Sequence, residues 1–116
     1  MAVSDRPRGR PADARFIDPD LLAERANEVA QRLALMASAP RLLVLCQLAK
    51  EGECSVTALQ DAVGLSQSAL SQHLARLRNA GTVATRRDGQ TILYSLADPK
   101  TRELMEAMYD IFCAAD

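Results

Sequence analysis

The chain has 116 residues, a length that suits one domain with a modest core. Aromatic residues make up 3% and Trp is absent, so the core must be built from Leu, Val, Ala and Met. Its 14 basic and 15 acidic residues give a net charge of −1, which by itself excludes no class of partner.

The first 17 residues are predicted to be a disordered basic arm, because they are rich in Arg, Pro, Ala and Asp and lack hydrophobic periodicity. No apolar stretch follows this basic start, so no signal peptide is predicted. The longest apolar run, Leu42–Cys46, is too short to span a bilayer. A cytosolic protein with no membrane partner is therefore expected.

The arm contains a possible DNA-binding motif. Arg8, Gly9 and Arg10 stand between two prolines, as in the core of an AT-hook, a peptide that lies in the minor groove. One interpretation is an accessory DNA-contacting arm. The other is a chance match in a segment of low complexity.

Residues 18–116 are predicted to form one domain that begins with two helices. Asp18 and Pro19 provide an N-cap acceptor and a proline at the first helical position. Apolar residues then recur at intervals of four and three, which predicts one stripe facing a partner. They are Leu22, Ala26, Val29, Leu33 and Met36. Pro40 opens a second helix that is apolar nearly all round and is expected at the centre of the domain, ending at Glu51-Gly52.

Two further helices and a hairpin follow. Ser55 and Ser66 are expected to cap the third and fourth helices, and Gly64 supplies the positive φ of the turn between them. Strands are predicted over residues 82–87 and 90–96, around the hairpin signal Asp88-Gly89. A two-residue loop at that dipeptide predicts Val83 opposite Tyr94 and Thr85 opposite Ile92.

Asp98-Pro99 repeats the helix-start chemistry and opens the last helix. This helix is expected to bury Leu104, Met108, Ile111 and Phe112. The predicted fold is mainly helical with a small β-hairpin: five helices and a wing, the layout of a dimeric winged helix-turn-helix protein.

The fourth helix is predicted to read DNA. Its leucines Leu70, Leu74 and Leu77 take one face. Amides, hydroxyls and a guanidinium, which suit hydrogen bonding to base edges in the major groove, project from the other. They are Gln67, Ser68, Ser71, Gln72 and Arg76. The bland alternative is a solvated polar face, which the following basic wing makes less attractive.

Charge is unevenly distributed in a way that supports this reading. Residues 64–96 carry four arginines against Asp88 alone, a net +3, whereas residues 98–116 carry two basic and five acidic residues, a net −3. Arg86 and Arg87 near the wing tip are expected to meet phosphates or the minor groove. Alternatively, they only keep an exposed hairpin soluble. His73 lies beside the leucine stripe and is expected to be a hydrogen-bonded, partly buried histidine rather than a metal ligand.

The order of helices, the segment GLSQSALSQHLARLR and the hairpin TRRDGQTILYSL resemble the ArsR/SmtB family of bacterial winged-helix repressors. The resemblance covers residues 18–113. It implies a homodimer, with the first and last helices at the dimer interface, that reads palindromic operator DNA. Metal sensors of this family carry a Cys-x-Cys pair on the third helix or His and acidic ligands on the last. Here the third helix reads SVTALQDAV and the last has no histidine, so no metal and no cofactor are expected.

The segments RLLVLCQL and MYDIFC resemble the sulfide- and persulfide-responsive, SqrR/BigR-like branch of that family. This resemblance implies that Cys46 and Cys113 are a redox-sensing pair, joined by a disulfide or a longer sulfur chain when reactive sulfur species act on them. Cys54 has no counterpart there and is expected to be a bystander. Without the resemblance, Cys46 reads as an ordinary small core residue.

The sequence is thus interpreted as a repressor that binds its operator when Cys46 and Cys113 are reduced. Bridging of the two thiols would release genes for sulfide oxidation or detoxification. No base–nucleophile pair, phosphate loop or cofactor motif points to an enzyme. Two alternatives stay open: the same repressor responding to a thiol-seeking metal or a general oxidant, and a winged-helix module for protein–protein contact.

Overall fold

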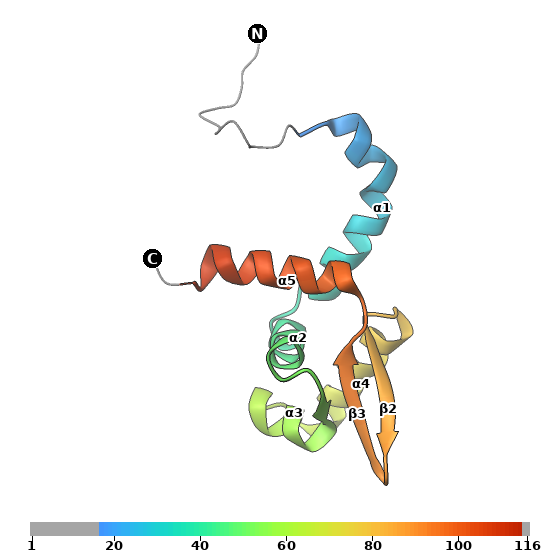
Figure 1. The fold of residues 1–116 in the computed structure, drawn as a ribbon, viewed down its shortest axis with the longest axis vertical. Coiled ribbons are helices and arrows are strands. Elements are labelled where there is room, and N and C mark those ends of the chain that lie inside the picture. Colours follow the sequence, from blue (N-terminus) through green and yellow to red (C-terminus); the bar gives the residue numbers. More distant parts are fainter. Residues whose placement is uncertain (1–16, 115–116) are drawn as a thin grey trace.

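The computed structural model describes residues 17–114, which form five helices and three short strands (Figure 1). The predicted accessory arm with Arg8, Gly9 and Arg10 lies outside the described residues. The elements in chain order are α1 (Pro19–Met36), α2 (Ala39–Glu51), β1 (Cys54–Ser55), α3 (Val56–Val63), α4 (Gln67–Asn79), β2 (Val83–Asp88), β3 (Thr91–Leu96) and α5 (Pro99–Phe112). The predicted fold class, mainly helical with a wing, is confirmed.

The predicted helix starts are confirmed by the hydrogen bonds that cap them. The side chains of Asp18, Ser55, Ser66 and Asp98 each accept from a main-chain N–H two or three residues ahead. The second helix begins slightly earlier than expected, because Ser38 is its N-cap and Pro40 occupies its second position. Gly64 adopts the left-handed conformation, with φ of 71°, that ends α3 and turns the chain into α4.

The core lies between α2, α3, α4 and the base of the hairpin. Its fully buried side chains are Val44, Leu45, Leu48, Leu59, Leu70, Leu74 and Leu77. One edge of α2 is open in the subunit, where Leu43 is 54% exposed and Cys46 is also exposed. The expectation that α2 is buried all round is therefore wrong at this edge.

The sheet has three strands in the order β1-β3-β2, all antiparallel. Strand β1 was not predicted, because two residues are too few to show an alternating pattern. The predicted hairpin register is wrong by two residues: Thr85 pairs with Tyr94, and Val83 pairs with Leu96. The loop is Gly89-Gln90, with Gly89 at φ 64°, because a left-handed glycine fits the first loop position of a tight hairpin. A shift of two keeps every side chain on its predicted face.

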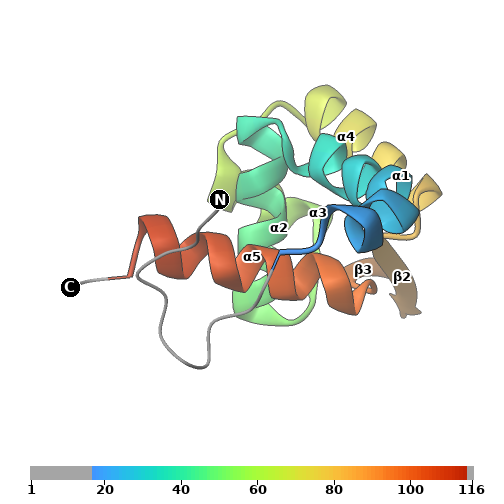
Figure 2. The same cartoon turned by 90° about the horizontal axis from the view of Figure 1, so that it is seen from above.

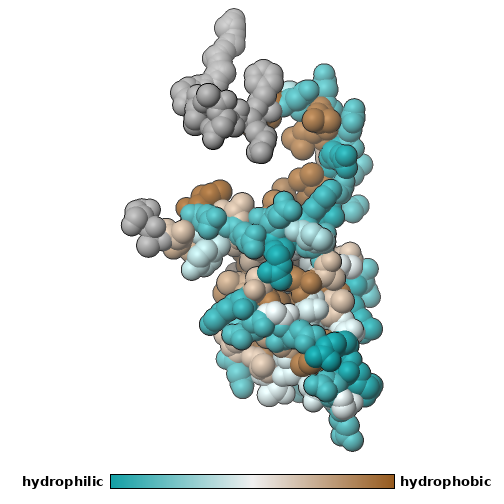
Figure 3. Space-filling view, viewed as in Figure 1, coloured by the Kyte–Doolittle hydropathy of each residue, from teal (hydrophilic) through white to brown (hydrophobic). Residues whose placement is uncertain are grey.

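Helices α1 and α5 leave apolar side chains exposed (Figure 3). Helix α1 rises away from the body and buries only Met36, at its C-terminal end (Figure 1). Helix α5 lies across α2, and its C-terminal part projects beyond the body (Figures 1 and 2). The predicted burial of Ile111 and Phe112 is therefore wrong for the single subunit, where they are 74% and 78% exposed. Met105 is the last buried residue of α5, and Leu104 and Met108 are half-buried.

Within residues 17–114 no single helix is long and apolar enough to cross a membrane. Helices α1 and α2 reach that length and apolarity only when taken together, and the chain bends by 94° between them.

Candidate nucleic-acid interface and thiol pair

Helix α4 presents the five predicted DNA-reading side chains on its exposed face. Its three leucines are buried at 0–1% exposure and fix the orientation of the helix on the core. The opposite side chains are all exposed: Gln67, Ser68, Ser71, Gln72 and Arg76. The Ser66 hydroxyl is engaged in capping, since it accepts from the main-chain N–H of Ala69 at 3.1 Å. The predicted readers therefore share one accessible surface that begins at the positive end of the helix dipole.

The two wing arginines differ in their surroundings. Arg86 forms a two-pronged ion pair with Glu53, from the loop between α2 and β1, with N–O distances of 2.6 and 2.8 Å. This guanidinium holds the pKa of Glu53 below its usual value. Arg87 is exposed, and among residues 17–114 it takes part in no ion pair. Because neighbouring strand residues point to opposite faces of a sheet, the two arginines leave the wing on opposite faces.

The three thiols are free, and they differ in access. Cys46 lies in the middle of α2 and Cys113 caps the end of α5; both are exposed. Cys54 is 4% exposed within β1. Burial, together with the charge of Glu51, raises the pKa of the Cys54 thiol. Because the thiolate is the reactive form, both the burial of Cys54 and its raised pKa lower the reactivity of this thiol.

The helices that carry the predicted thiol pair contact each other: α5 lies directly above α2 in Figure 1 and passes in front of it in Figure 2. Cys113 stands eight positions beyond Met105, which is about 12 Å along a helix axis. The structure therefore brings the two helices together but leaves Cys113 on the projecting end of α5. Among residues 17–114 no group of three or more His, Cys, Asp or Glu side chains is placed to hold a metal ion.

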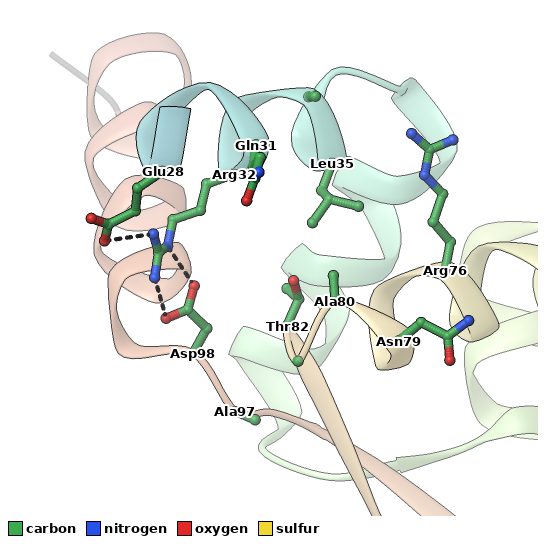
Figure 4. Close-up of a pocket in the computed structure, with 12 residues that line it drawn as sticks. Glu28, Gln31, Arg32, Leu35, Arg76, Asn79, Ala80, Thr82, Ala97 and Asp98 are labelled. Atoms are coloured by element: carbon green, nitrogen blue, oxygen red, sulfur yellow. Dashed lines mark hydrogen bonds and ion pairs between the residues drawn. The ribbon is translucent and has the colours of Figure 1, made fainter. Parts of the chain in front are cut away.

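A network of charges joins α1 to the start of α5 (Figure 4). Arg32 donates to both carboxylate oxygens of Asp98, at 2.7 and 3.3 Å, and to Glu28 at 2.9 Å. Lys100 donates to the same Glu28 oxygen at 3.1 Å. The hydrogen bonds from Arg32 and then from Thr101 lower the pKa of Asp98 to about 2. The network borders an open groove of about 780 Å³ between α1, the end of α4 and the start of α5.

Several residues at these contacts were not singled out from the sequence. Glu53 and Arg32 pair with residues 33 and 66 positions away, and no local sequence pattern indicates such pairs. Asp98 was predicted only as the N-cap of the last helix, and its ion pair with Arg32 was not predicted. The sequence does indicate that Arg41 is unusual, because a cation in the first turn of a helix is disfavoured by the helix dipole. Such a position suggests a stabilising contact outside the helix. His73 is half-buried and hydrogen-bonded to Arg41, as expected for a satisfied histidine.

Known bacterial regulatory proteins are similar to this chain. The model of the family described as "Bacterial regulatory protein, arsR family" matches residues 39–85, from α2 to β2. The chain is 42% identical over 114 residues to the biofilm growth-associated repressor of Agrobacterium fabrum, covering 98% of this chain and 97% of the relative.

Solved structures agree in fold over most of the chain. The transcriptional repressor BigR from Xylella fastidiosa superposes with a TM-score of 0.79 at 41% identity, covering 85% of this chain and all of that one. Reduced HlyU from Vibrio cholerae gives a TM-score of 0.75 at 37% identity, covering 82% of this chain and 99% of that one.

Proposed function

The chain belongs to the arsR family of bacterial regulatory proteins, and we propose that it is a homodimeric repressor. Two of its thiols are proposed to control its affinity for operator DNA. As a member of that family it is a DNA-binding transcriptional regulator and not an enzyme. We propose in addition that it represses its genes, that reactive sulfur species are its inducer, and that the residues named below contact DNA or sense the inducer.

DNA recognition is assigned to α4 and the wing. The exposed face of α4 enters the major groove by its N-terminal half, where Gln67, Ser68, Ser71 and Gln72 reach base edges and Arg76 lies one turn further on. Arg87 meets a phosphate from the wing. Arg86 is also a predicted phosphate contact, but it must first break its ion pair with Glu53.

Dimerisation is assigned to α1 and α5. An 18-residue helix that buries only Met36 gains little from its own subunit, because helical stability in proteins comes mainly from packing an apolar face. Leu21, Leu22 and Leu33 on α1 are about half exposed, as is Tyr109 on α5. With Ile111 and Phe112 they form the apolar surface that a second copy of the chain would cover.

Sensing is assigned to Cys46 and Cys113, and the observation that carries this assignment is their exposure on two helices in contact, while Cys54 is buried. One thiolate attacks the outer sulfur of a persulfide, RSSH, and releases RSH. The second thiol then attacks the new Cys–SSH and expels H₂S, leaving Cys–S–S–Cys. The two thiols lose two electrons, and the sulfane sulfur gains them.

A longer bridge follows from a second persulfide: two thiols and two RSSH give Cys–S–S–S–Cys, two RSH and H₂S. A direct disulfide needs Cα atoms within about 7 Å. Because Cys113 stands on the projecting end of α5, either bridge draws that end toward α2. The displaced α5 changes the dimer surface, and the bridged dimer loses affinity for the operator. The genes released are proposed to serve sulfide oxidation or detoxification.

The proposal is tested by intact mass spectrometry and gel shift on the same samples. A duplex of the chain's own promoter is the probe, and wild type, Cys46→Ser, Cys113→Ser and Cys54→Ser are treated with a persulfide donor. Wild type and Cys54→Ser should lose two hydrogens, with or without added sulfur of about 32 Da per atom, and release the duplex. Neither of the other two variants should form the bridge or release DNA.

Each rival gives a different result. Bridging by peroxide but not by persulfide indicates a general oxidant, and a bound metal ion in place of a bridge indicates metal sensing. Absence of any retarded complex with reduced wild type, at low as well as raised salt, indicates a module for protein–protein contact and overturns the repressor proposal.

A further inference from the structure

Arg41 carries the only buried charge among residues 17–114, with 8% of its surface exposed. It forms no ion pair within that range. Burial, and then the nearby charge of Arg76, lower the pKa of Arg41. A buried cation without a carboxylate is costly unless its donors find acceptors, so the acceptors of Arg41 indicate what the side chain does.

Two acceptors are carbonyl oxygens in the last turn of α1. Arg41 Nε donates to the Leu35 oxygen at 2.7 Å, and Nη2 donates to the Ala34 oxygen at 3.4 Å. The last four carbonyls of a helix lack partners within it and form the negative end of its dipole, so a cation is favourable there. Within its own helix Arg41 is in the first turn, where the dipole disfavours it. Its position is thus explained by α1 and not by α2.

The third acceptor is on the predicted recognition helix. Arg41 Nη1 lies 3.4 Å from Nδ1 of His73. A guanidinium can only donate, so a hydrogen bond at this contact requires Nδ1 to offer its lone pair and the ring proton to be on Nε2. His73 is half-buried next to Gln72, which faces outward. Helix α4 lies beside the end of α1 and the start of α2 (Figure 2), so one side chain links all three helices.

We infer that Arg41 is a positioning residue for DNA binding, which fixes the recognition helix relative to α1 through the neutral imidazole of His73. The inference rests on the proposed function, because two α4 helices match an operator only when each is held at a set place relative to the dimerisation helices. Arg41 is buried and touches no DNA. Its loss misplaces Gln72 and its neighbours without removing a DNA contact.

Variants of the full chain separate positioning from folding. Arg41→Lys keeps the charge but replaces three donor nitrogens on a rigid fork, which reach α1 and α4 separately, by a single nitrogen. His73→Asn keeps an acceptor near the place of Nδ1, whereas His73→Leu removes it. Arg25→Lys is the matched control, because Arg25 is an exposed arginine of α1 that touches neither carbonyls nor α4. Dimer content and melting temperature are recorded for every variant, and affinity is measured by anisotropy of a labelled promoter duplex.

We expect Arg41→Lys and His73→Leu each to weaken DNA binding by the folded dimer about ten-fold. His73→Asn should lose less than about three-fold, and Arg25→Lys should match wild type. The double variant Arg41→Lys/His73→Leu should be no weaker than either single variant, because both changes break one link. A purely structural Arg41 would lower the melting temperature, leave the affinity of the folded dimer within about two-fold of wild type, and overturn the inference.

The imidazole of His73 allows a second measurement, which is made without DNA and does not require that an Arg41 variant still binds DNA. His73 is the only histidine in the chain, so every imidazole signal in a nitrogen-15 spectrum belongs to it, and the couplings to the ring carbon-bound protons tell Nδ1 from Nε2. In neutral wild type Nδ1 should be the unprotonated nitrogen, and Arg41→Lys should give a mixture of tautomers. If wild type binds no promoter DNA, the proposed function fails, and this spectrum still decides the Arg41–His73 link: a proton on Nδ1 overturns it.

Discussion

The carboxylate of Asp98 both caps a helix and forms an ion pair. It caps the N-terminus of α5 and accepts two hydrogen bonds from Arg32 of α1, and the Thr101 hydroxyl donates to it at 2.6 Å. The side chain is 17% exposed, so solvent screens this pairing only in part. The charge of Asp98 therefore joins the two helices that are proposed to form the dimer.

The low pKa of Asp98 predicts acid sensitivity. Its folded-state pKa of about 2 lies below the ordinary 3.8, so the ionised form stabilises the fold above pH 4, and that contribution is lost as the pH falls from about 4 to about 2. The stabilisation amounts to about 2 kcal/mol. Asp98→Asn keeps the N-cap but removes the charge. Urea unfolding at fixed protein concentration should show wild type more stable by about that amount at pH 7 and equal to the variant near pH 2.

The control for this measurement is Asp110→Asn, which removes an exposed carboxylate of the same helix that forms no ion pair among residues 17–114. It should follow wild type across the pH range. A difference between wild type and Asp98→Asn that does not change with pH would show that the Asp98 charge contributes nothing to stability.

At the scale of elements, the wing shows how an ion pair divides two neighbouring arginines. Arg86 already has a carboxylate partner, whereas Arg87 is exposed and unpaired within the described part of the chain. A phosphate contact shows as counterion release, about one unit of slope in a plot of log affinity against log salt. We expect Arg87→Gln to flatten the slope by about one unit, and Arg86→Gln by less than about half a unit. Equal changes would mean that Arg86 leaves Glu53 for DNA.

The recognition helix makes a different prediction, about sequence. Gln72 is an exposed amide that can pair bidentately with adenine, whereas phosphate contacts act on every sequence alike. Gln72→Ala should cost about 1–3 kcal/mol on the operator and little on unrelated DNA of the same length. Competition binding with the two duplexes measures this ratio. An equal loss on both would place Gln72 on the backbone and not on a base.

Elements with strong local signals were predicted well, and long-range pairings were not. The caps at Ser66 and Asp98 are chemical features of adjacent residues, so the sequence shows them directly. The two-residue strand β1 exists only because Cys54 pairs with Tyr94, 40 positions later. The predicted readers on α4 share one exposed face because three leucines fix the opposite one, but the anchoring by Glu53 and Arg41 depends on tertiary contacts.

At the scale of the whole molecule, an expectation about burial also depends on the partner. The apolar residues Ile111 and Phe112 read as core residues in the sequence, yet they are exposed in the subunit. A hydrophobic pattern predicts that a helix face is buried, but it does not indicate whether the same subunit or a second one buries it. The same holds for Leu22 and Leu33 on α1.

This proposed interface predicts that a charge on α5 dissociates the dimer. Phe112→Asp should give a monomer at micromolar concentration, because an unpaired carboxylate would be buried at the subunit contact. Ala62→Asp adds the same charge on the exposed side of α3 and should stay dimeric. Sedimentation velocity measures both. A dimeric Phe112→Asp of unchanged affinity would remove the end of α5 from the interface.

The N-terminal half of α1, residues 19–27, is exposed throughout and stands away from the body (Figure 1), and this affects the lifetime of the protein. A long helix without a packed face frays, and a frayed segment is a preferred site of proteolytic cleavage. Newly made subunits would thus be degraded until enough of them accumulate to protect one another. The steady-state concentration of the regulator would then increase more steeply than its rate of synthesis.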